Sequence, residues 1–370
     1  MRLAASYVAH VISIRSYCKV GSMKKILFIC GSINQTSQMH RISMHLPDYD
    51  HYFTPYYADG FIEVMRKMGL VDYTVLGRKL AGRCMAYLRT HDLNLDYGGT
   101  LHEYDLVLTC SDLVMPRNIR AKKVILVQEG MTDRENAIYH IVKALKLPRY
   151  LASTSTMGLS HAYDYFCVAS EGYRELFIRK GVNPARIRVT GIPNFDNCVE
   201  FLKNEFPHRN HVLVATSDMR ETFKWENRKK FIHECLRIAD GRQLIFKLHP
   251  NERADRATRE INRWAPEALV YPSGNTDHMI ANCSVLITRY SSVVHVGLAL
   301  GKEVHSSFDL AMLRRLLPIQ NGGTSAQAIA SLCRHHIQGM PVPATYGELM
   351  ATAEMSAPLR LNNAIATRGY

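Results

Sequence analysis

Short, unbroken apolar runs that alternate with helix-like segments constrain the fold of this chain most. The first run, Ile26 to Cys30, follows two lysines and ends at Gly31-Ser32. An apolar run with no polar interruption is typical of a strand buried on both faces, and such strands occur mainly in parallel sheets covered by helices. A helix-like stretch from Gln35 to His45 follows directly. This opening predicts an α/β fold with a Rossmann-type start, although a full G-x-G-x-x-G fingerprint is absent.

The alternation is repeated in two blocks. In the first block, further strands are predicted at Tyr73–Leu76, Leu106–Thr109, Val124–Val127, Phe166–Ala169 and Ile187–Thr190. In the second block, they are predicted at Val212–Ala215, Leu244–Phe246, Leu269–Tyr271, Val285–Ile287 and Val304–Ser306. Helix-like segments between successive strands favour parallel pairing.

Gly191 to Asp196 interrupts this alternation and includes Pro193, so we place a hinge there. We therefore expect two Rossmann-like, doubly wound parallel-sheet domains with a cleft between them. The expected boundaries are an N-terminal extension (1–22), an N-terminal domain (23–195), a C-terminal domain (208–345), and a final helix and tail (346–370).

The composition indicates a folded, basic protein. Of its 370 residues, 47% are hydrophobic and 21% charged, and the formal net charge is +13. Such a charge favours an anionic partner, which could be a sugar nucleotide, a lipid phosphate on an anionic membrane, or nucleic acid. Because the chain has no nucleic-acid-binding motif and its basic residues are scattered among acids, we do not expect nucleic acid.

Cysteine usage and hydropathy suggest the compartment. The nine cysteines include no C-x-x-C pair, which favours a reducing cytoplasm without disulfides or a zinc site. No apolar run approaches the roughly twenty residues needed to cross a bilayer. We expect a cytoplasmic protein that can lie peripherally on the inner face of a membrane, and no cofactor or metal ion.

Two segments of the second block predict a diphosphate site. Lys247-Leu-His-Pro250 and Thr288-Arg-Tyr-Ser-Ser292 each follow a predicted buried strand. The carboxyl ends of parallel strands line the ligand crevice of an open sheet, and the start of a helix attracts anions. We therefore expect Lys247, His249, Thr288, Ser291 and Ser292 to hold a nucleotide diphosphate. The two serines could equally be a plain helix cap.

Candidate catalytic residues come from the first block. Glu129 follows the strand at Val124–Val127, and Asp112 follows the strand at Leu106–Thr109. A carboxylate at either place could act as a general base. Glu129 could instead form a structural ion pair with Arg134 or Arg117, and Asp112 could belong to a turn.

Two further pairs complete the predicted site. The Gly31-Ser32 turn could point backbone donors at a substrate or could be only a tight turn. Arg220 is expected beside the diphosphate and Glu221 at the substrate, unless the two residues bind each other.

Motifs of the second block resemble those of CDP-glycerol glycerophosphotransferases and polysialyltransferases, which are GT-B enzymes. Lys247-Leu-His-Pro250 resembles their His-Pro element, Val285 to Ser292 resembles their LITDYSS element, and Ala299 to Lys302 resembles their ALGKP element. The resemblance implies that His249, Ser291 and Ser292 hold the diphosphate of the donor. Arg289 replaces the usual aspartate of the second element and would add positive charge there.

Over nearly its whole length the chain also resembles UDP-N-acetylglucosamine 2-epimerases. Ser111-Asp112 resembles their GD element, Gln128 to Met131 their VEAGL element, and Arg186 to Gly191 their IxxTG element. This resemblance places Asp112 and Glu129 at catalytic carboxylates. The epimerase histidine before RRE and the acidic SGGxQEE segment are both missing, which argues against the epimerase reaction itself.

Together these features predict a GT-B glycosyltransferase or glycerophosphotransferase. It would transfer a sugar or polyol phosphate from a nucleotide-linked donor to a glycan or lipid-linked acceptor of the bacterial cell envelope. The alternatives are a UDP-N-acetylglucosamine 2-epimerase-like epimerase or hydrolase, and a non-catalytic binding protein that keeps the fold.

Overall fold

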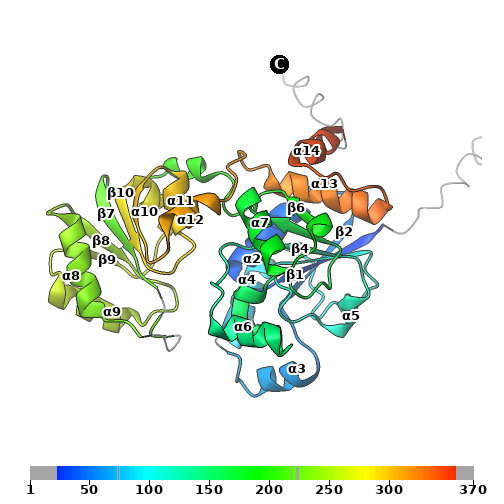
Figure 1. The fold of residues 1–370 in the computed structure, drawn as a ribbon, viewed down its shortest axis with the longest axis horizontal. Coiled ribbons are helices and arrows are strands. Elements are labelled where there is room, and N and C mark those ends of the chain that lie inside the picture. Colours follow the sequence, from blue (N-terminus) through cyan, green and yellow to red (C-terminus); the bar gives the residue numbers. More distant parts are fainter. Residues whose placement is uncertain (1–22, 73, 75, 218, 222–224, 356–370) are drawn as a thin grey trace, which may run out of the picture.

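The computed structural model describes residues 23–355, apart from 73, 75, 218 and 222–224. It contains two parallel sheets, as the sequence predicted. The first has the strand order β2-β1-β3-β4-β5-β6, and the second has the order β11-β10-β7-β8-β9. Figure 1 shows the sheets in two separate lobes, each flanked by helices. The predicted α/β class with two doubly wound domains is confirmed.

The strands are short and mostly buried. The first sheet consists of β1 (Lys25–Cys30), β2 (Asp50–Pro55), β3 (Leu106–Thr109), β4 (Val124–Val127), β5 (Tyr165–Val168) and β6 (Ile187–Val189). The second consists of β7 (His211–Ala215), β8 (Leu244–Lys247), β9 (Leu269–Tyr271), β10 (Cys283–Thr288) and β11 (Glu303–His305).

One strand lies where the sequence did not predict it. β2 is an edge strand that pairs with β1 in parallel, and its polar sequence Asp-His-Tyr-Phe-Thr-Pro has no apolar run. Conversely, the predicted strand Tyr73–Leu76 is wrong where it can be followed, because Thr74 lies in a bend and Leu76 in a turn. Residues 73 and 75 fall outside the described part.

Helices cover both faces of the first sheet. They are α2 (Ile33–Ser43), α3 (Gly60–Lys67), α4 (Arg78–Thr90), α5 (Arg117–Arg120), α6 (Ala137–Ala144) and α7 (Glu171–Lys180), with 3-10 helices at Arg149–Thr156 and Pro184–Arg186. The side chains of β1 alternate between two cores. Phe28 packs with α2 and α4 on one face, while Leu27 and Ile29 pack on the other, where α7 lies.

The second sheet is also covered on both faces. Its helices are α8 (Arg228–Ala239), α9 (Ala254–Trp264), α10 (Thr276–Asn282), α11 (Val294–Ala299) and α12 (Leu310–Arg315), and a 3-10 helix spans Cys198–Leu202. α8 and α9 share one core, and α10, α11 and α12 share the other. All five strands predicted in this block are present.

The last two helices return to the first domain. α13 (Ser325–Gln338) and α14 (Tyr346–Met355) pack into the core that contains Phe28, β3 and α2. Figure 1 places both helices over the N-terminal lobe. The sequence-based C-terminal domain of residues 208–345 included α13, so this part of the boundary differs from the packing. The helix is apolar enough to cover either sheet, and the sequence does not say which one.

Two connections cross between the domains and are bonded to each other. Asp196 accepts a hydrogen bond from the amide of Ser325 at 2.9 Å, and its carbonyl oxygen accepts one from the amide of Asn321 at 2.9 Å. Gly191 has φ +73°, and a Cβ there would lie 2.3 Å from the Ser325 hydroxyl. At the predicted hinge the backbone therefore passes so close to Ser325 that no side chain larger than that of glycine fits at position 191.

The cysteines and the helix lengths relate to two expectations from the sequence, that disulfides and membrane-spanning segments are absent. The eight cysteines in the described part of the chain are buried free thiols, and four of them, at positions 30, 110, 167 and 283, lie in or next to strands. No helix of the described part is long and apolar enough to cross a membrane.

Candidate active site

The carboxyl ends of β7, β8 and β10 lie side by side and carry most of the predicted diphosphate site. β7 pairs with β8 on one side and with β10 on the other, so the chain connections leave it in opposite directions. Open parallel sheets bind ligands outside the strand ends at such a switch point. Thr216 follows β7, His249 lies just after β8, and Ser291 lies just after β10.

A cavity of about 500 Å³ opens at these strand ends and is shared by both domains. The second domain lines it with four predicted residues, Lys247, His249, Ser291 and Ser292. The first domain and the linker face them with Asn34, Ser37, Arg41, Asn194 and Phe195. The volume lies within the range of about 300–1,000 Å³ that is usual for small-molecule sites.

His249 is oriented by its own backbone and by its neighbours. Its amide donates to the Thr216 hydroxyl at 2.9 Å, which fixes the loop after β8 to the end of β7. The amide of Asn251 donates to Nδ1 of the His249 ring at 3.2 Å. Since Nδ1 accepts, the neutral ring carries its proton on Nε2. An Nε2–H group is a suitable donor for a phosphate oxygen.

Lys247 lies deeper in the wall of the cavity. It is 5% exposed, and its ammonium donates to the carbonyl oxygen of Leu248 at 2.7 Å. Burial lowers the pKa of Lys247, and the carboxylate of Glu252 acts in the opposite direction. This cation therefore contributes positive potential from behind the histidine loop.

The serine pair precedes α11 and only partly fits the expected anion site. The amides of Val294 and His295 donate to the carbonyl oxygens of Ser291 and Ser292 at 3.3 and 3.0 Å. These amides are therefore already used within the turn, contrary to the expectation of unused N–H groups. α11 is also only six residues long. The Ser291 hydroxyl also accepts a hydrogen bond from the amide of Val293 at 3.5 Å, as expected for the helix-cap alternative, while both serines line the cavity.

Glu129 is held by the loop after β1. Its two carboxylate oxygens accept hydrogen bonds from the Ser32 hydroxyl at 2.7 Å and from the Gln35 side-chain amide at 2.6 Å. Ser32 also caps α2 by accepting from the amide of Gln35 at 3.1 Å. The predicted Gly31-Ser32 turn thus serves to orient this carboxylate.

The ion pairs considered for Glu129 are not formed between the described residues. The guanidinium of Arg134 instead lies 4.8 Å from the ring centre of Phe308, and Arg117 donates its amide to Asp59 at 2.7 Å. The loop of Glu129 meets the second domain, because a Cβ built on Gly130 would lie 4.0 Å from Cβ of Ser292. The loop of Glu129 therefore approaches the serine pair, although the Glu129 side chain is not among those that line the cavity.

Asp112 has a structural environment. Its side chain is fully buried and accepts from Arg149 at 2.9 Å, from the amide of Gly158 at 3.1 Å and from the amide of Ser160 at 2.9 Å. Both carboxylate oxygens are occupied, and solvent does not reach them. The residue anchors the 149–160 segment to β3, which does not fit its predicted role as a base in contact with substrate.

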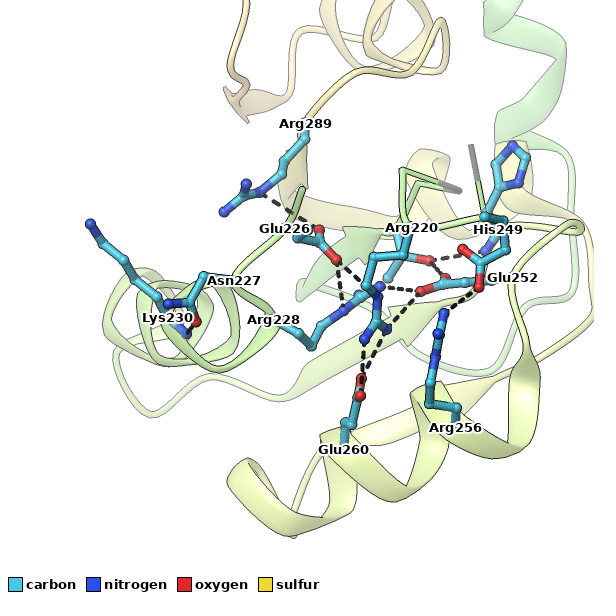
Figure 2. A network of polar contacts seen from close by, with 12 residues as sticks. Arg220, Glu226, Asn227, Arg228, Lys230, His249, Glu252, Arg256, Glu260 and Arg289 are labelled. Carbon is cyan, nitrogen blue, oxygen red and sulfur yellow. Dashed lines mark hydrogen bonds and ion pairs between the residues drawn. The ribbon is translucent and has the colours of Figure 1, made fainter. Parts of the chain in front are cut away.

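Arg220 belongs to a network of ion pairs beneath the histidine loop (Figure 2), and Glu221 forms its own ion pair next to it. Arg220 contacts both carboxylate oxygens of Glu260 at 2.9 Å, and Glu221 pairs with Arg256. Neither residue lines the cavity between the domains. The expected direct contact of Arg220 with a diphosphate, and of Glu221 with substrate, is thus replaced by partners on α9.

The centre of this network is buried. Glu226 and Glu252 have side-chain exposures of 1% and 0%, and both pair with Arg228. Glu252 also accepts a hydrogen bond from the Thr216 hydroxyl. The same hydroxyl accepts a hydrogen bond from the amide of His249. A continuous chain of contacts therefore runs from Arg228 through Glu252 and Thr216 to the histidine loop. Such a network fixes the geometry of the cavity wall.

Thr288 and Arg289 do not line the cavity. The Thr288 side chain is buried at 2% exposure. The guanidinium of Arg289 lies 4.5 Å from the ring centre of Phe231 and 3.9 Å from Glu226 (Figure 2). The positive charge expected beside the phosphate site is therefore directed at an internal carboxylate.

Several residues of the cavity had not been selected from the sequence. Asn34, Ser37 and Arg41 line it from one face of α2, and their spacing of three and four residues is the signal that could have revealed them. Arg41 also donates to the carbonyl oxygen of Pro193 at 2.7 Å, which ties α2 to the linker. Asp277 lines the opposite side, and burial raises its pKa.

Within the described ranges, no three His, Cys, Asp or Glu side chains gather in a way that could hold a metal ion. The chain matches no protein-family model, and no curated protein sequence matches it.

Solved structures do resemble it. One is described as a UDP-N-acetylglucosamine 2-epimerase from Listeria monocytogenes, with 13% identity, a TM-score of 0.56, and coverage of 88% of this chain and 99% of the other. Another is the UDP-GlcNAc 2-epimerase from Neisseria meningitidis bound to UDP-GlcNAc, with 9% identity, a TM-score of 0.50, and coverage of 90% and 99%. The wall teichoic acid polymerase TagF matches with 12% identity, a TM-score of 0.49, and coverage of 91% and 97%.

The chain has the GT-B fold. At these identities the likeness concerns the fold alone. In the GT-B arrangement observed here, the two Rossmann-like domains face each other across the cavity that contains His249 and the serine pair.

Proposed function

We propose that this chain is a GT-B transferase that uses a nucleotide-activated donor to extend a bacterial cell-envelope polysaccharide. The observation that supports this most is the cavity between the domains, with Lys247, His249, Ser291 and Ser292 on one wall. The C-terminal domain binds the donor, which is a nucleotide-linked sugar or polyol phosphate. The N-terminal domain binds a glycan or lipid-linked acceptor at the cytoplasmic face of the membrane.

The donor diphosphate meets three kinds of group in this scheme. Nε2–H of His249 and the hydroxyls of Ser291 and Ser292 donate hydrogen bonds to phosphate oxygens. Lys247 supplies positive potential from behind, and Arg41 supplies it from across the cavity. Such groups stabilise the charge that grows on the leaving nucleotide.

Glu129 is the general base of this scheme. It takes the proton of the acceptor hydroxyl as that oxygen attacks the donor, while the bond to the leaving phosphate breaks. Ser32 and Gln35 orient its carboxylate, and the next residue, Gly130, lies close to Ser292. A base in this position contributes typically 10²–10⁴-fold to the rate.

A thermal-shift screen against CDP-, UDP- and CMP-linked donors tests the donor site. A ligand that binds only the native state raises the melting temperature by mass action. His249→Ala should reduce the shift, whereas His233→Ala, which removes an exposed histidine of α8, should not. If no donor shifts the wild type, or if both variants respond equally, the proposed donor site is wrong.

A second measurement separates binding from chemistry. Glu129→Gln keeps the size of the side chain and its contacts with Ser32, but removes the base. We expect a thermal shift within about twofold of the wild-type response and a transfer rate at least about 100-fold lower. An unchanged transfer rate would exclude Glu129 as the base.

The second candidate is an epimerase or hydrolase of a sugar nucleotide. It is favoured by the UDP-N-acetylglucosamine 2-epimerases that share the fold at TM-scores of 0.50 and above. Against it, Asp112, the expected second catalytic carboxylate, is fully buried and saturated with donors. Incubation with UDP-N-acetylglucosamine and no acceptor distinguishes the two, because a new epimer or free sugar would favour the epimerase or hydrolase.

A further inference from the structure

We propose that α3 and α6 form a docking face by which the N-terminal domain binds the surface of a bilayer rich in anionic phospholipids. Two exposed apolar stripes would enter the interface between headgroups and acyl chains. A basic hollow between them would receive lipid phosphates. This inference does not depend on the transferase activity.

The first stripe lies on α3. Phe61, Val64 and Met68 are 72%, 51% and 68% exposed, and their spacing of three and four residues places them on one face. The opposite face, with Ile62 and Met65, packs against the domain core. The helix is therefore already packed against the domain through one face, and its other face exposes large apolar side chains to solvent.

The second stripe lies on α6 and has the same spacing. Ile138, Ile141 and Leu145 are 52%, 51% and 67% exposed, while Tyr139 and Val142 of the other face are buried. A helix that is apolar on both faces is expected only where a partner covers the outer one.

These exposed side chains are concentrated in two segments. Of the twenty exposed large hydrophobic residues in the described part of the chain, nine lie within 61–70 and 138–151. A single exposed apolar residue needs no explanation, but a contiguous group does. Figure 1 shows α3 and α6 at the same end of the N-terminal lobe. One cavity of about 730 Å³ is lined by both segments, so they are neighbours.

The charges of this cavity identify the partner as anionic. Three basic residues of its lining, Arg120, Lys143 and Lys146, are exposed, and the lining contains a single acid, Asp59. The side chains of Arg120 and Lys143 donate to backbone carbonyl oxygens, and no carboxylate of the described residues pairs with them. Lys146 at the end of α6 is exposed.

The acids on this face carry little unpaired charge. Glu63 of α3 is neutralised by Arg66 at 2.6 Å. Asp59 accepts a hydrogen bond from the backbone amide of Arg117 at 2.7 Å and keeps its charge, so it is the one acid in the lining of the hollow. Apolar side chains flanked by basic ones are the combination that binds an anionic membrane interface. A soluble protein partner could bury the stripes, but it would not by itself require a basic hollow between them.

The face also fits the geometry of the cleft. α6 follows the loop that carries Glu129, and its His140 lines a second groove between the domains together with Arg134 and Phe308. A bilayer against α3 and α6 would hold a lipid-linked molecule close to this groove.

Vesicle co-sedimentation tests the docking face. The full chain is mixed with vesicles of phosphatidylcholine alone or with 30% phosphatidylglycerol, and the bound fraction gives a partition coefficient. We expect binding to the anionic vesicles that is at least about tenfold stronger than to neutral ones. Phe61→Glu and Ile141→Glu should each weaken it by about tenfold or more, because each removes one large apolar side chain from the interface.

The matched control is Leu236→Glu. It makes the same change of charge at an exposed leucine of α8, which Figure 1 places in the other lobe. This variant should bind nearly as the wild type does. Lys67→Gln and Lys146→Gln should each weaken binding to anionic vesicles by about fivefold, without changing binding to neutral ones.

Three results would overturn the proposal. The wild type could fail to bind anionic vesicles, or Phe61→Glu and Ile141→Glu could bind no worse than Leu236→Glu. Light scattering could also show an oligomer that these two variants dissociate, while lipid has no effect, and the face would then be a contact between copies of this chain. Circular dichroism of each variant checks that it is folded.

Discussion

Thr216 is the residue whose replacement tests the histidine loop most directly. Its side chain is 4% exposed, and its hydroxyl donates to the carboxylate of Glu252 while accepting the amide of His249 at 2.9 Å. Thr216→Val keeps the shape and removes both hydrogen bonds. A bond to a charged group contributes about 1.5–3 kcal/mol and a neutral one about 1 kcal/mol. We therefore expect a loss of about 3 kcal/mol in the free energy of unfolding.

The assay can be restricted to the affected domain. The chain has two tryptophans, Trp225 and Trp264, and both lie in the second domain. Urea unfolding followed by tryptophan fluorescence therefore reports on that domain. With a denaturant slope of about 2 kcal/mol/M, a loss of about 3 kcal/mol moves the midpoint down by about 1.5 M.

Thr216→Ser is the matched control, because it keeps the hydroxyl and loses only a methyl group, at a cost of about 1 kcal/mol. The Val variant should also give a smaller thermal shift with a bound donor, since the His249 amide loses its anchor. If the Val and Ser variants unfold within about 0.5 kcal/mol of each other, the Thr216 hydroxyl does not hold this loop.

Three further predictions concern stability. Asp112→Ala should lower the free energy of unfolding, measured in urea, by about 3–5 kcal/mol, because it leaves the partly buried Arg149 without its carboxylate partner. A loss below about 1 kcal/mol would contradict the anchor role. Gly172→Ala would place a methyl group 1.9 Å from a carbonyl oxygen of α12, so a loss of about 1–3 kcal/mol is expected, whereas Gly82→Ala has nothing within 4 Å and should cost nothing. Burial lowers the pKa of His211 and His295 to about 4, against about 6.5 when unfolded. Below pH 6.5 the unfolded chain therefore binds protons that the folded chain does not. The melting temperature should fall as the pH is lowered from 6.5 to 4 and should stay level above pH 7. In a His295→Phe variant this fall should be shallower.

The interior strands could be predicted because each is a continuous apolar run, and burial on both faces requires such a run. β2 lacked this signal, because its polar residues are tolerated at the edge of the sheet. The strand predicted at Tyr73–Leu76 shows the opposite error, since a short apolar run can also pack as a turn against the core, as Leu76 does.

The position of the cavity could also be anticipated. His249 and the serine pair each follow a strand, and the carboxyl ends of neighbouring parallel strands necessarily lie together. Charged residues did not follow this logic. Asp112 pairs with Arg149, which lies 37 residues away in the chain, and Arg220 pairs with Glu260, which lies 40 residues away. A guanidinium or carboxylate near a site binds whichever opposite charge the fold brings to it, and no local pattern specifies that partner.

The sequence by itself determined the α/β class, the two parallel sheets, and the strand ends that carry His249, Ser291 and Ser292, because these depend on local periodicity and on the geometry common to parallel sheets. Only the tertiary structure decided that α13 covers the first domain, that Glu129 is held by Ser32 and Gln35, and that α3 and α6 expose apolar faces. Each of these depends on contacts between segments far apart in the chain. Several arrangements bury the same apolar surface and satisfy the same polar groups locally, and the packing of the whole chain selects one of them.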